Sequence, residues 1–305
     1  MRIGIFGGTD AVSGGSVDAI VAAAQKTADD GFASYWLPQV FGADALTALA
    51  AVGREVPGIE FGTAVVPTYP RHPLALAAQA LTVQSATGNR LSLGIGLSHQ
   101  VVVEGMWGYS FDKPVRHMRE YLTVLRGAIH GETVQFQGDT LKAMTFGPIT
   151  VGNADPCPIL VAALGERMLK LTGKMAEGTI TWVTGPATLA DHTVPTITAA
   201  ASAAGRPAPR VVAGLPVCVT DDVDAARGRA GAVFAIYGSL PSYRAMLDRE
   251  GAAGPADVAI VGDEAAVEAG IKRLAEAGAT DFLAVEFGAD ESERTRTRDV
   301  LRGLV

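Results

Sequence analysis

Short apolar runs alternate along this chain with longer segments whose apolar residues recur every three or four positions. The run Glu60–Val66 carries no charge after its first residue and is β-branched at its end, which is typical of a strand covered on both faces. It is followed by Pro73, a favoured first residue of a helix, and by Leu74, Ala77 and Leu81 on one helical face. This stretch predicts a strand, a loop and a helix, the repeating unit of an α/β protein.

The same unit recurs from one end of the chain to the other. No linker rich in Pro and Ser interrupts it, so we expect one domain over residues 1–305. Strands alternating with helices in this number predict a closed parallel (β/α)8 barrel of the TIM type. An open doubly wound sheet fits the same periodicity and is the structural alternative. The strands are expected at residues 2–7, 34–38, 60–66, 90–96, 158–163, 178–183, 210–219 and 281–287.

Two connections are longer than the repeat requires, which predicts insertions after strands four and seven. Residues 101–114 contain Trp107 and Tyr109 and are expected to form a lid or an insertion. A Gly-Asp turn in Glu132–Thr145 predicts a hairpin outside the barrel. The long Ala-rich connection after the seventh strand is expected to hold an extra helix within Tyr237–Glu250.

Composition excludes several classes of function. The chain has 25 basic and 32 acidic side chains, a net charge of −7 and no run of like charge, so neither nucleic acid nor a membrane surface is an expected partner. No stretch approaches the roughly 20 apolar residues of a membrane span, and the start lacks the apolar core of a signal peptide. A cytoplasmic location is therefore expected. Cys157 and Cys218 lack metal-site spacing and no HxH pair occurs, so neither a metal site nor a disulfide is predicted.

Three motifs in order identify a family resemblance. They are GTAV at Gly62–Val65, RHP at Arg71–Pro73 before an apolar helix, and GNRLSLGIG at Gly88–Gly96. Together they resemble the bacterial-luciferase-like oxidoreductases, in particular the branch that uses coenzyme F420, a deazaflavin. The resemblance covers the whole chain and implies a barrel enzyme that is usually a homodimer, with F420, or alternatively FMN, bound to it.

The resemblance also assigns cofactor contacts. It implies a non-prolyl cis peptide at Ala64-Val65, in a bulge with Val66, that backs the central ring of the cofactor. Its phosphate-binding turn falls on Ala162, Ala163, Leu164 and Gly165, and a companion turn falls on Val183, Thr184 and Gly185. The sequence pattern at Gly165 is independently consistent with a phosphate site, because a strand runs directly into a helix whose first N–H groups could face an anion.

The fourth strand leads into the third candidate site. Glycines as far as Gly96 would let a flat ring lie against the backbone, and Leu97, Ser98 and His99 follow. Ser98 and His99 are expected to supply hydrogen bonds, and His99 is the candidate catalytic histidine.

The second strand ends at the other candidate catalytic residue. Relatives that oxidise alcohols have an acidic residue and a histidine where this chain has Gln39 and Val40. Gln39 can donate or accept a hydrogen bond but cannot act as a general base at neutral pH. Hydride donation to an unsaturated or carbonyl substrate is therefore favoured over alcohol oxidation.

We expect a small organic substrate to bind under Trp107, Tyr109 and Trp182, and the cofactor tail to lie near Arg71, Arg167 and Lys170. The alternatives are an FMN-dependent luciferase-like monooxygenase and a catalytically silent flavin-binding protein.

Overall fold

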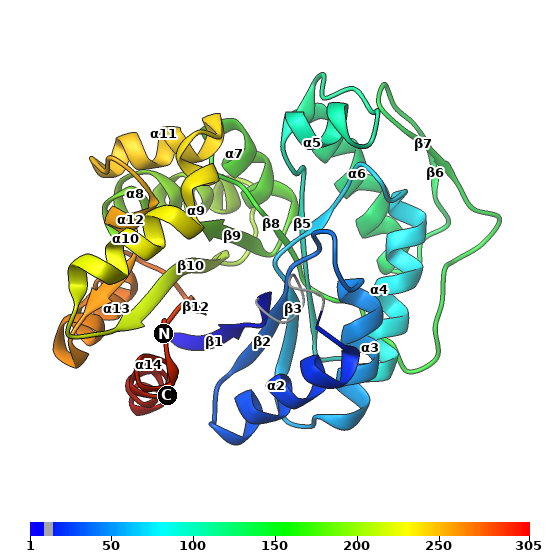
Figure 1. Cartoon of the computed structure of the whole chain (residues 1–305). Helices are drawn as coiled ribbons and strands as arrows, with labels where there is room; N and C mark the ends of the chain where they lie inside the picture. The colour runs from blue at the N-terminus through cyan, green and yellow to red at the C-terminus, as the bar shows by residue number, and fades with distance from the viewer. Residues whose placement is uncertain (9–14) are drawn as a thin grey trace.

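The computed structural model describes residues 1–8 and 15–305, and within these ranges the chain forms a closed barrel of parallel strands (Figure 1). β1 pairs in parallel with β2 on one side and with β12 on the other, which closes the ring. The predicted TIM-type barrel is therefore confirmed, and the open sheet is excluded. In order around the ring the strands are β1 (Arg2–Phe6), β2 (Ser34–Leu37), β3 (Glu60–Thr63), β5 (Leu91–Gly96), β8 (Ile159–Val161), β9 (Gly178–Trp182), β10 (Arg210–Val219) and β12 (Asp281–Glu286).

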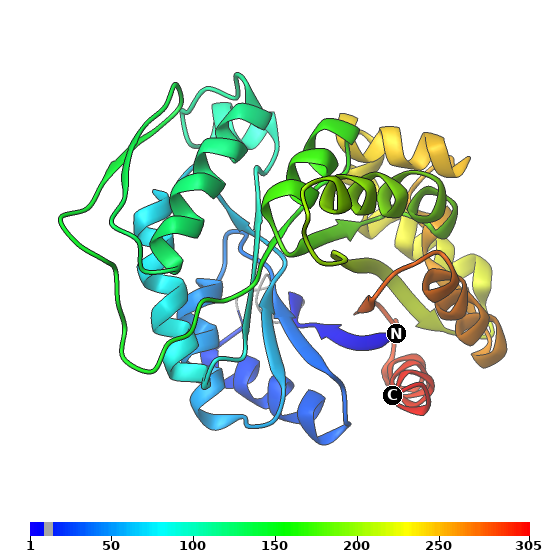
Figure 2. The same cartoon turned by 180° about the vertical axis from the view of Figure 1, so that it is seen from behind.

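Helices cover the outside of the ring, and both termini lie at the same end of the barrel (Figures 1 and 2). Several begin at a residue whose side chain accepts a hydrogen bond from the first turn, as Asp44 does from Thr47 and Asp263 from Ala266. No helix in the described ranges is long and apolar enough to cross a membrane. The main helices are α2 (Val17–Asp29), α3 (Ala45–Glu55), α4 (Pro73–Thr87), α6 (Pro114–Ile129), α7 (Glu166–Met175), α9 (Val194–Ala203), α13 (Glu264–Glu276) and α14 (Glu291–Gly303).

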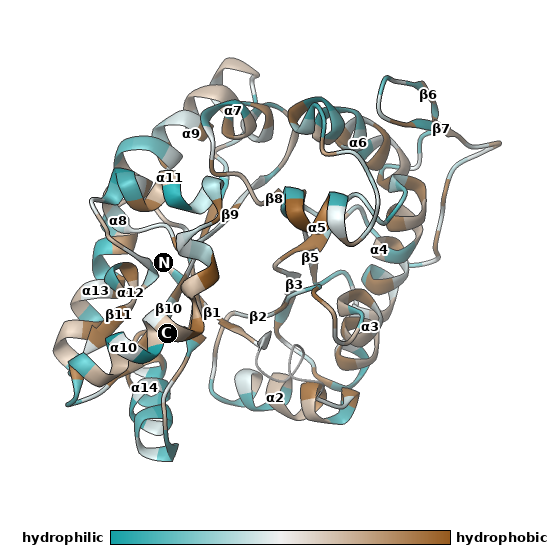
Figure 3. Cartoon of the chain, turned by 45° about the horizontal axis from the view of Figure 1, so that its top comes forward, coloured by the Kyte–Doolittle hydropathy of each residue, from teal (hydrophilic) through white to brown (hydrophobic). Residues whose placement is uncertain are grey.

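The excursions fall where they were expected but contain more structure. After β5 the chain forms α5 (Gln100–Gly105), and the predicted hairpin is the antiparallel pair β6–β7 outside the barrel (Figure 3). The connection after β10 includes α11 (Pro241–Glu250) and also β11, a short strand paired beside β10 that the sequence pattern did not predict. The smaller elements are β4 (Val66–Pro67), β6 (Gln135–Gln137), β7 (Lys142–Met144), α8 (Pro186–Thr188), η1 (Leu189–Thr193), α10 (Val223–Val233), η2 (Ala235–Gly238), α12 (Pro255–Val258) and β11 (Ile260–Gly262).

Apolar side chains fill the inside of the barrel around Trp36. The Trp36 side chain is 1% exposed and packs with Leu160 of β8, Val212 of β10 and Leu283 of β12. Glycine is required opposite it, because a Cβ at Gly62 would stand 2.1 Å from Trp36 Cε3. The Trp36 indole N–H donates to Ser34 Oγ at 2.7 Å, so its polar atom is satisfied despite burial.

Charged residues close the barrel at the amino-terminal ends of the strands. Arg210 binds Asp281 with two nitrogens, at 2.6 and 2.9 Å, and Glu60 with a third at 2.7 Å. Glu60 also binds Arg2 at 2.6 Å, and Arg210 lies over the Trp36 ring at 5.5 Å. The ion pairs therefore join β1, β3, β10 and β12 below the apolar interior.

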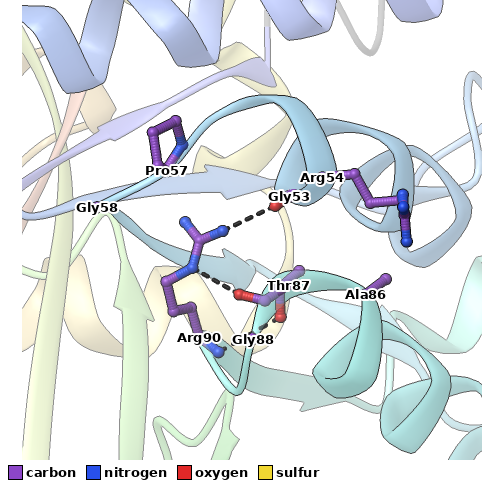
Figure 4. Close-up of a pocket in the computed structure, with 8 residues that line it drawn as sticks. All are labelled: Gly53, Arg54, Pro57, Gly58, Ala86, Thr87, Gly88 and Arg90. Atoms are coloured by element: carbon purple, nitrogen blue, oxygen red, sulfur yellow. Dashed lines mark hydrogen bonds between the residues drawn. The ribbon is translucent and has the colours of Figure 1, made fainter.

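Arg90, in the motif at Gly88–Gly96, stabilises the same end of the barrel from outside. Figure 4 shows its side chain in a hollow of about 360 Å³ between α3 and α4. It donates to the carbonyl oxygens of Gly53 at 2.7 Å, Val56 and Ile59 at 2.9 Å, and Thr87 at 2.5 Å. One guanidinium therefore satisfies the carbonyl ends of two helices.

His117 on α6 is buried beside the end of β4. Its Nε2 lies 3.1 Å from Thr68 Oγ1, and Tyr69 stacks on the ring at 4.1 Å. Burial lowers the pKa of His117 to about 4, against a smaller opposing effect of Glu120. The imidazole is therefore neutral in the folded protein at neutral pH.

Replacing Arg90 by Met should lower the free energy of unfolding by about 3 kcal/mol, because several buried carbonyls lose a charged donor together. Arg90→Lys should recover only part of that loss, since an ammonium cannot reproduce the planar guanidinium. Chemical denaturation followed by circular dichroism measures both. Arg54→Met, in the same hollow, is the matched control, and equal losses in the two Met variants would contradict this role.

The stability of the wild-type protein should fall as the pH is lowered from about 6.5 to about 4. Over this range the unfolded chain protonates His117 whereas the folded site keeps it neutral, at a cost of up to about 3 kcal/mol. The pH dependence of the unfolding free energy that His117 contributes should disappear in His117→Gln. It should persist in His130→Gln, because His130 is exposed. Urea titrations at several pH values test this, and an unchanged slope in His117→Gln would refute it.

Candidate functional site

A cavity of about 990 Å³ opens at the carboxyl ends of the barrel strands. Its floor includes Phe6, Ala64 and Val65, which pack on the Trp36 cluster inside the barrel. In Figure 3, α5 lies over the ring of strands at this end. The strand-to-helix connections of a barrel form its active face, so this is where chemistry is expected.

The structure brings most of the predicted site residues to this one cavity. They come from the ends of four neighbouring strands, β2, β3, β5 and β8. Their shared location agrees with one site, while their individual roles stay predictions. The predicted residues among its lining are Gln39, Ala64, Val65, Gly96, Leu97, Ser98, His99, Ala162, Leu164 and Gly165.

The other predicted residues lie outside the lining. Val66 and Ala163 are fully buried, with no exposed surface to offer a ligand. In the companion turn Val183 and Thr184 are also fully buried, and Gly185 faces Glu250.

Glu250, the last residue of α11, occupies the N–H groups beside the companion turn. Its carboxylate accepts from Ala187 N at 3.1 Å and from Thr188 N at 2.7 Å. A Cβ at Gly185 would stand 2.3 Å from Glu250 Cδ, so the glycine makes room for a carboxylate of the same chain. No sequence pattern predicts this contact, because Glu250 lies about 60 residues further along the chain.

The strand end at Ala64 has an unusual backbone. The Ala64-Val65 peptide is cis, as the family resemblance implied, and it separates β3 from β4. Around this break the side chain of Thr63 replaces ladder contacts, donating to Gly94 O at 2.8 Å and accepting from Gly94 N at 2.9 Å. A Cβ at Gly96 would stand 2.7 Å from Val65 Cγ2, so glycine keeps this wall of the cavity flat.

His99 follows a sharp turn after β5. Ser98 has a φ of 63°, in the left-handed region, and His99 then begins α5 as its N-cap residue. The imidazole lines the cavity and lies 5.6 Å from the Tyr243 ring on α11. Burial lowers the pKa of His99, so it is neutral at pH 7 and a weaker base than free imidazole.

Gln39 is held by the start of α3. Its Oε1 accepts from Ala45 N at 2.8 Å and from Arg71 Nη2 at 3.4 Å. Arg71 also binds Asp44, and Lys170 binds Glu166 at 2.5 Å, so two of the three predicted tail contacts are engaged within the chain. Arg167 is exposed on α7.

The aromatic roof differs from the one expected. Trp182 lines the cavity as predicted, but Trp107 and Tyr109 lie outside its lining. Tyr237 and Tyr243 take their place, with Tyr237 edge-on to Trp182 at 5.7 Å and to Tyr243 at 5.0 Å. The available signal was an aromatic pair within Tyr237–Glu250, and only the folded connection shows that it turns inward.

Gly96→Ala should destabilise the protein by about 1 to 3 kcal/mol, because the new methyl group must displace Val65 or Ala162 from the cavity wall. Gly228→Ala is the control, since it adds a methyl group to α10 with nothing within 4 Å and should be neutral or stabilising. Thermal unfolding measures both, and a Gly96→Ala variant as stable as the control would show that the wall is not closely packed.

Comparisons with known proteins identify the family of the chain. The family model described as luciferase-like monooxygenase matches residues 1–286. A 5,10-methylenetetrahydromethanopterin reductase of Methanolobus tindarius is 28% identical over 211 residues, 68% of this chain. The match spans 63% of that relative, less than two thirds of its length.

Solved structures share the fold over nearly the whole chain. The coenzyme F420-dependent tetrahydromethanopterin reductase of Methanopyrus kandleri superposes with a TM-score of 0.80 at 21% identity, covering 99% of this chain and 97% of the reductase. The FMN-bound oxygenating constituent of 3,6-diketocamphane monooxygenase from Pseudomonas putida gives 0.76 at 18% identity, covering 99% and 96%. With a family model matched over most of its length, this chain belongs to the luciferase-like monooxygenase family.

Proposed function

We propose that this protein is an F420-dependent oxidoreductase that transfers a hydride between the deazaflavin and a small organic substrate, in the reducing direction. The observation that carries the proposal is the flat cavity wall that Gly96 and Val65 form at the carboxyl face of the barrel. The coenzyme F420-dependent reductase of Methanopyrus kandleri, which shares this fold, supports F420 as the cofactor, and the FMN-bound monooxygenase makes FMN the alternative.

The residues present fit a flat tricyclic ring with an anionic tail. Gly96 leaves the wall beside Val65 free of side-chain bulk, and the cavity is lined mainly by apolar groups. Gly165 begins α7 without any side-chain cap, so the first N–H groups of that ten-residue helix are available to a phosphate. Ala162, Leu164 and Gly165 would hold the phosphate end, and the bound deazaflavin would supply a hydride at its C5 carbon.

The side chains around the cavity favour reduction. Oxidation of an alcohol needs a base that removes the hydroxyl proton, and Gln39 cannot do so. His99 is weakened as a base by burial. A substrate that receives a hydride must be bound and oriented, which an amide and a neutral imidazole can do, and the proton that completes the reduction would come from water.

Titration with oxidised F420 and, separately, with FMN tests the cofactor assignment by fluorescence quenching. F420 should bind at least tenfold more tightly than FMN. Gly165→Asp should weaken F420 binding about tenfold or more, because a carboxylate at the N-cap competes with the phosphate for the same N–H groups. A Cβ at Gly165 meets nothing within 4 Å, so the variant is expected to fold.

Gly152→Asp is the matched control, because it adds the same charge in an exposed loop. Preference for FMN would move the assignment to a monooxygenase, and binding without turnover of any acceptor would indicate a silent flavin-binding protein. Equal losses in the two Asp variants would remove the phosphate from the start of α7.

A further inference from the structure

The cavity carries almost no charge. No Lys or Arg is among its lining residues in the described part of the chain, and residues 9–14, TDAVSG, contain neither type. A carboxylate or phosphate on the substrate would therefore find no cationic side chain to offset its desolvation.

The titratable groups of the lining are mostly neutral at pH 7. Burial lowers the pKa of His99 and raises the pKa values of Tyr237 and Tyr243. Among the described residues, Glu104 is the carboxylate that lines the cavity. It is engaged within the chain, since it accepts hydrogen bonds from Gln100 Nε2 at 2.9 Å and from Phe111 N at 3.2 Å. The walls thus favour an uncharged, largely apolar molecule.

Gln39 adds a polar contact of fixed direction. Two donors, Ala45 N and Arg71 Nη2, converge on one end of its amide, which must therefore be the oxygen. Arg71 is itself held in place by Asp44 and by Tyr121, whose hydroxyl donates to the Arg71 carbonyl at 2.8 Å. Turning the amide over would place its NH2 group against both donors, so this orientation is locked.

The remaining polar atom of Gln39 is Nε2, a donor without an acceptor among the described residues, on a side chain that lines the cavity. We propose that the substrate is a neutral, mainly apolar molecule with a carbonyl-type oxygen, which Gln39 Nε2 binds as a hydrogen-bond donor. This proposal rests on the proposed function for the reaction but not for the binding. It makes Gln39 a residue that favours a ligand whose oxygen accepts a hydrogen bond over one of the same shape without an oxygen.

The selectivity can be measured with a matched set of ligands of one shape. The ketone α-tetralone only accepts a hydrogen bond at its oxygen, and α-tetralol can both accept and donate one. Tetralin has no oxygen, and tetralin carboxylate carries a charge. Dissociation constants would be measured by calorimetry with the protein saturated with whichever of F420 or FMN it binds. The wild-type protein should bind the ketone about tenfold more tightly than tetralin, and the carboxylate least tightly.

Gln39→Glu is the decisive variant. Its carboxylate keeps the shape of the side chain and can still accept from Ala45 N and Arg71, but it presents an acceptor to the cavity. It should lose the tighter binding of the ketone relative to tetralin and bind α-tetralol, which can donate to the carboxylate, more tightly than α-tetralone. A merely structural role would weaken the two ligands alike, so the tighter binding of α-tetralol distinguishes recognition from folding. Gln39→Met should bind both no better than tetralin.

Gln79→Glu is the matched control. Gln79 on α4 accepts from the same Arg71 at 3.5 Å but does not line the cavity, so the variant should keep the ketone preference. Tight binding of tetralin carboxylate, or an unchanged ketone preference in Gln39→Glu, would overturn the proposal. If neither cofactor binds, the proposed function fails, and the same ligand comparison on the protein alone still decides the substrate class.

Discussion

The contact of Arg210 with Trp36, Asp281 and Glu60 is the constraint on which the barrel depends. A closed sheet needs its interior filled, and here a large aromatic ring does so with a guanidinium beneath it. The guanidinium binds Asp281 on the neighbouring strand β12 and Glu60 on β3 across the barrel, so the charged layer ties together strands on both sides of the interior. The ion pairs are partly buried, and their hydrogen bonds satisfy the charges that the barrel encloses.

This arrangement separates stability from function along the barrel axis. Arg210 and Arg90 hold the amino-terminal end of the strands, from inside and from outside respectively. The carboxyl end is left to loops, aromatic side chains and the break at Ala64-Val65. Gln39 lies between the two, since the start of α3 binds its oxygen and the side chain lines the cavity.

The sequence predicted the barrel because its signals are local. An apolar run such as Glu60–Val66 predicts a buried strand from its composition alone. Only the family resemblance predicted the cis peptide at Ala64-Val65 that interrupts this strand. The cavity lining at Gly96–His99 was found in the same way, since glycines mark a strand exit. What the pattern missed depends on contacts distant in sequence. β11 is too short to have a period, and the inward turn of Tyr237 and Tyr243 depends on how α11 packs.

Charge was harder to place than hydrophobicity. Arg71 was expected to face a cofactor tail, but Asp44 lies close enough to bind it. The orientation of the Gln39 amide likewise depends on two donors that meet it only in the folded chain. The sequence shows how many charged and polar side chains are present, but it does not show which of them contact one another in the folded chain.

The carboxylate of Glu250 has a thermodynamic consequence for the turn after β9. An anion that binds Ala187 N and Thr188 N must displace a group tethered to the same chain, whose effective concentration far exceeds that of any free ligand. Releasing Glu250 would also loosen the end of α11, the helix that brings Tyr243 to the cavity. One carboxylate therefore joins the turn after β9 to the helix that carries part of the cavity roof.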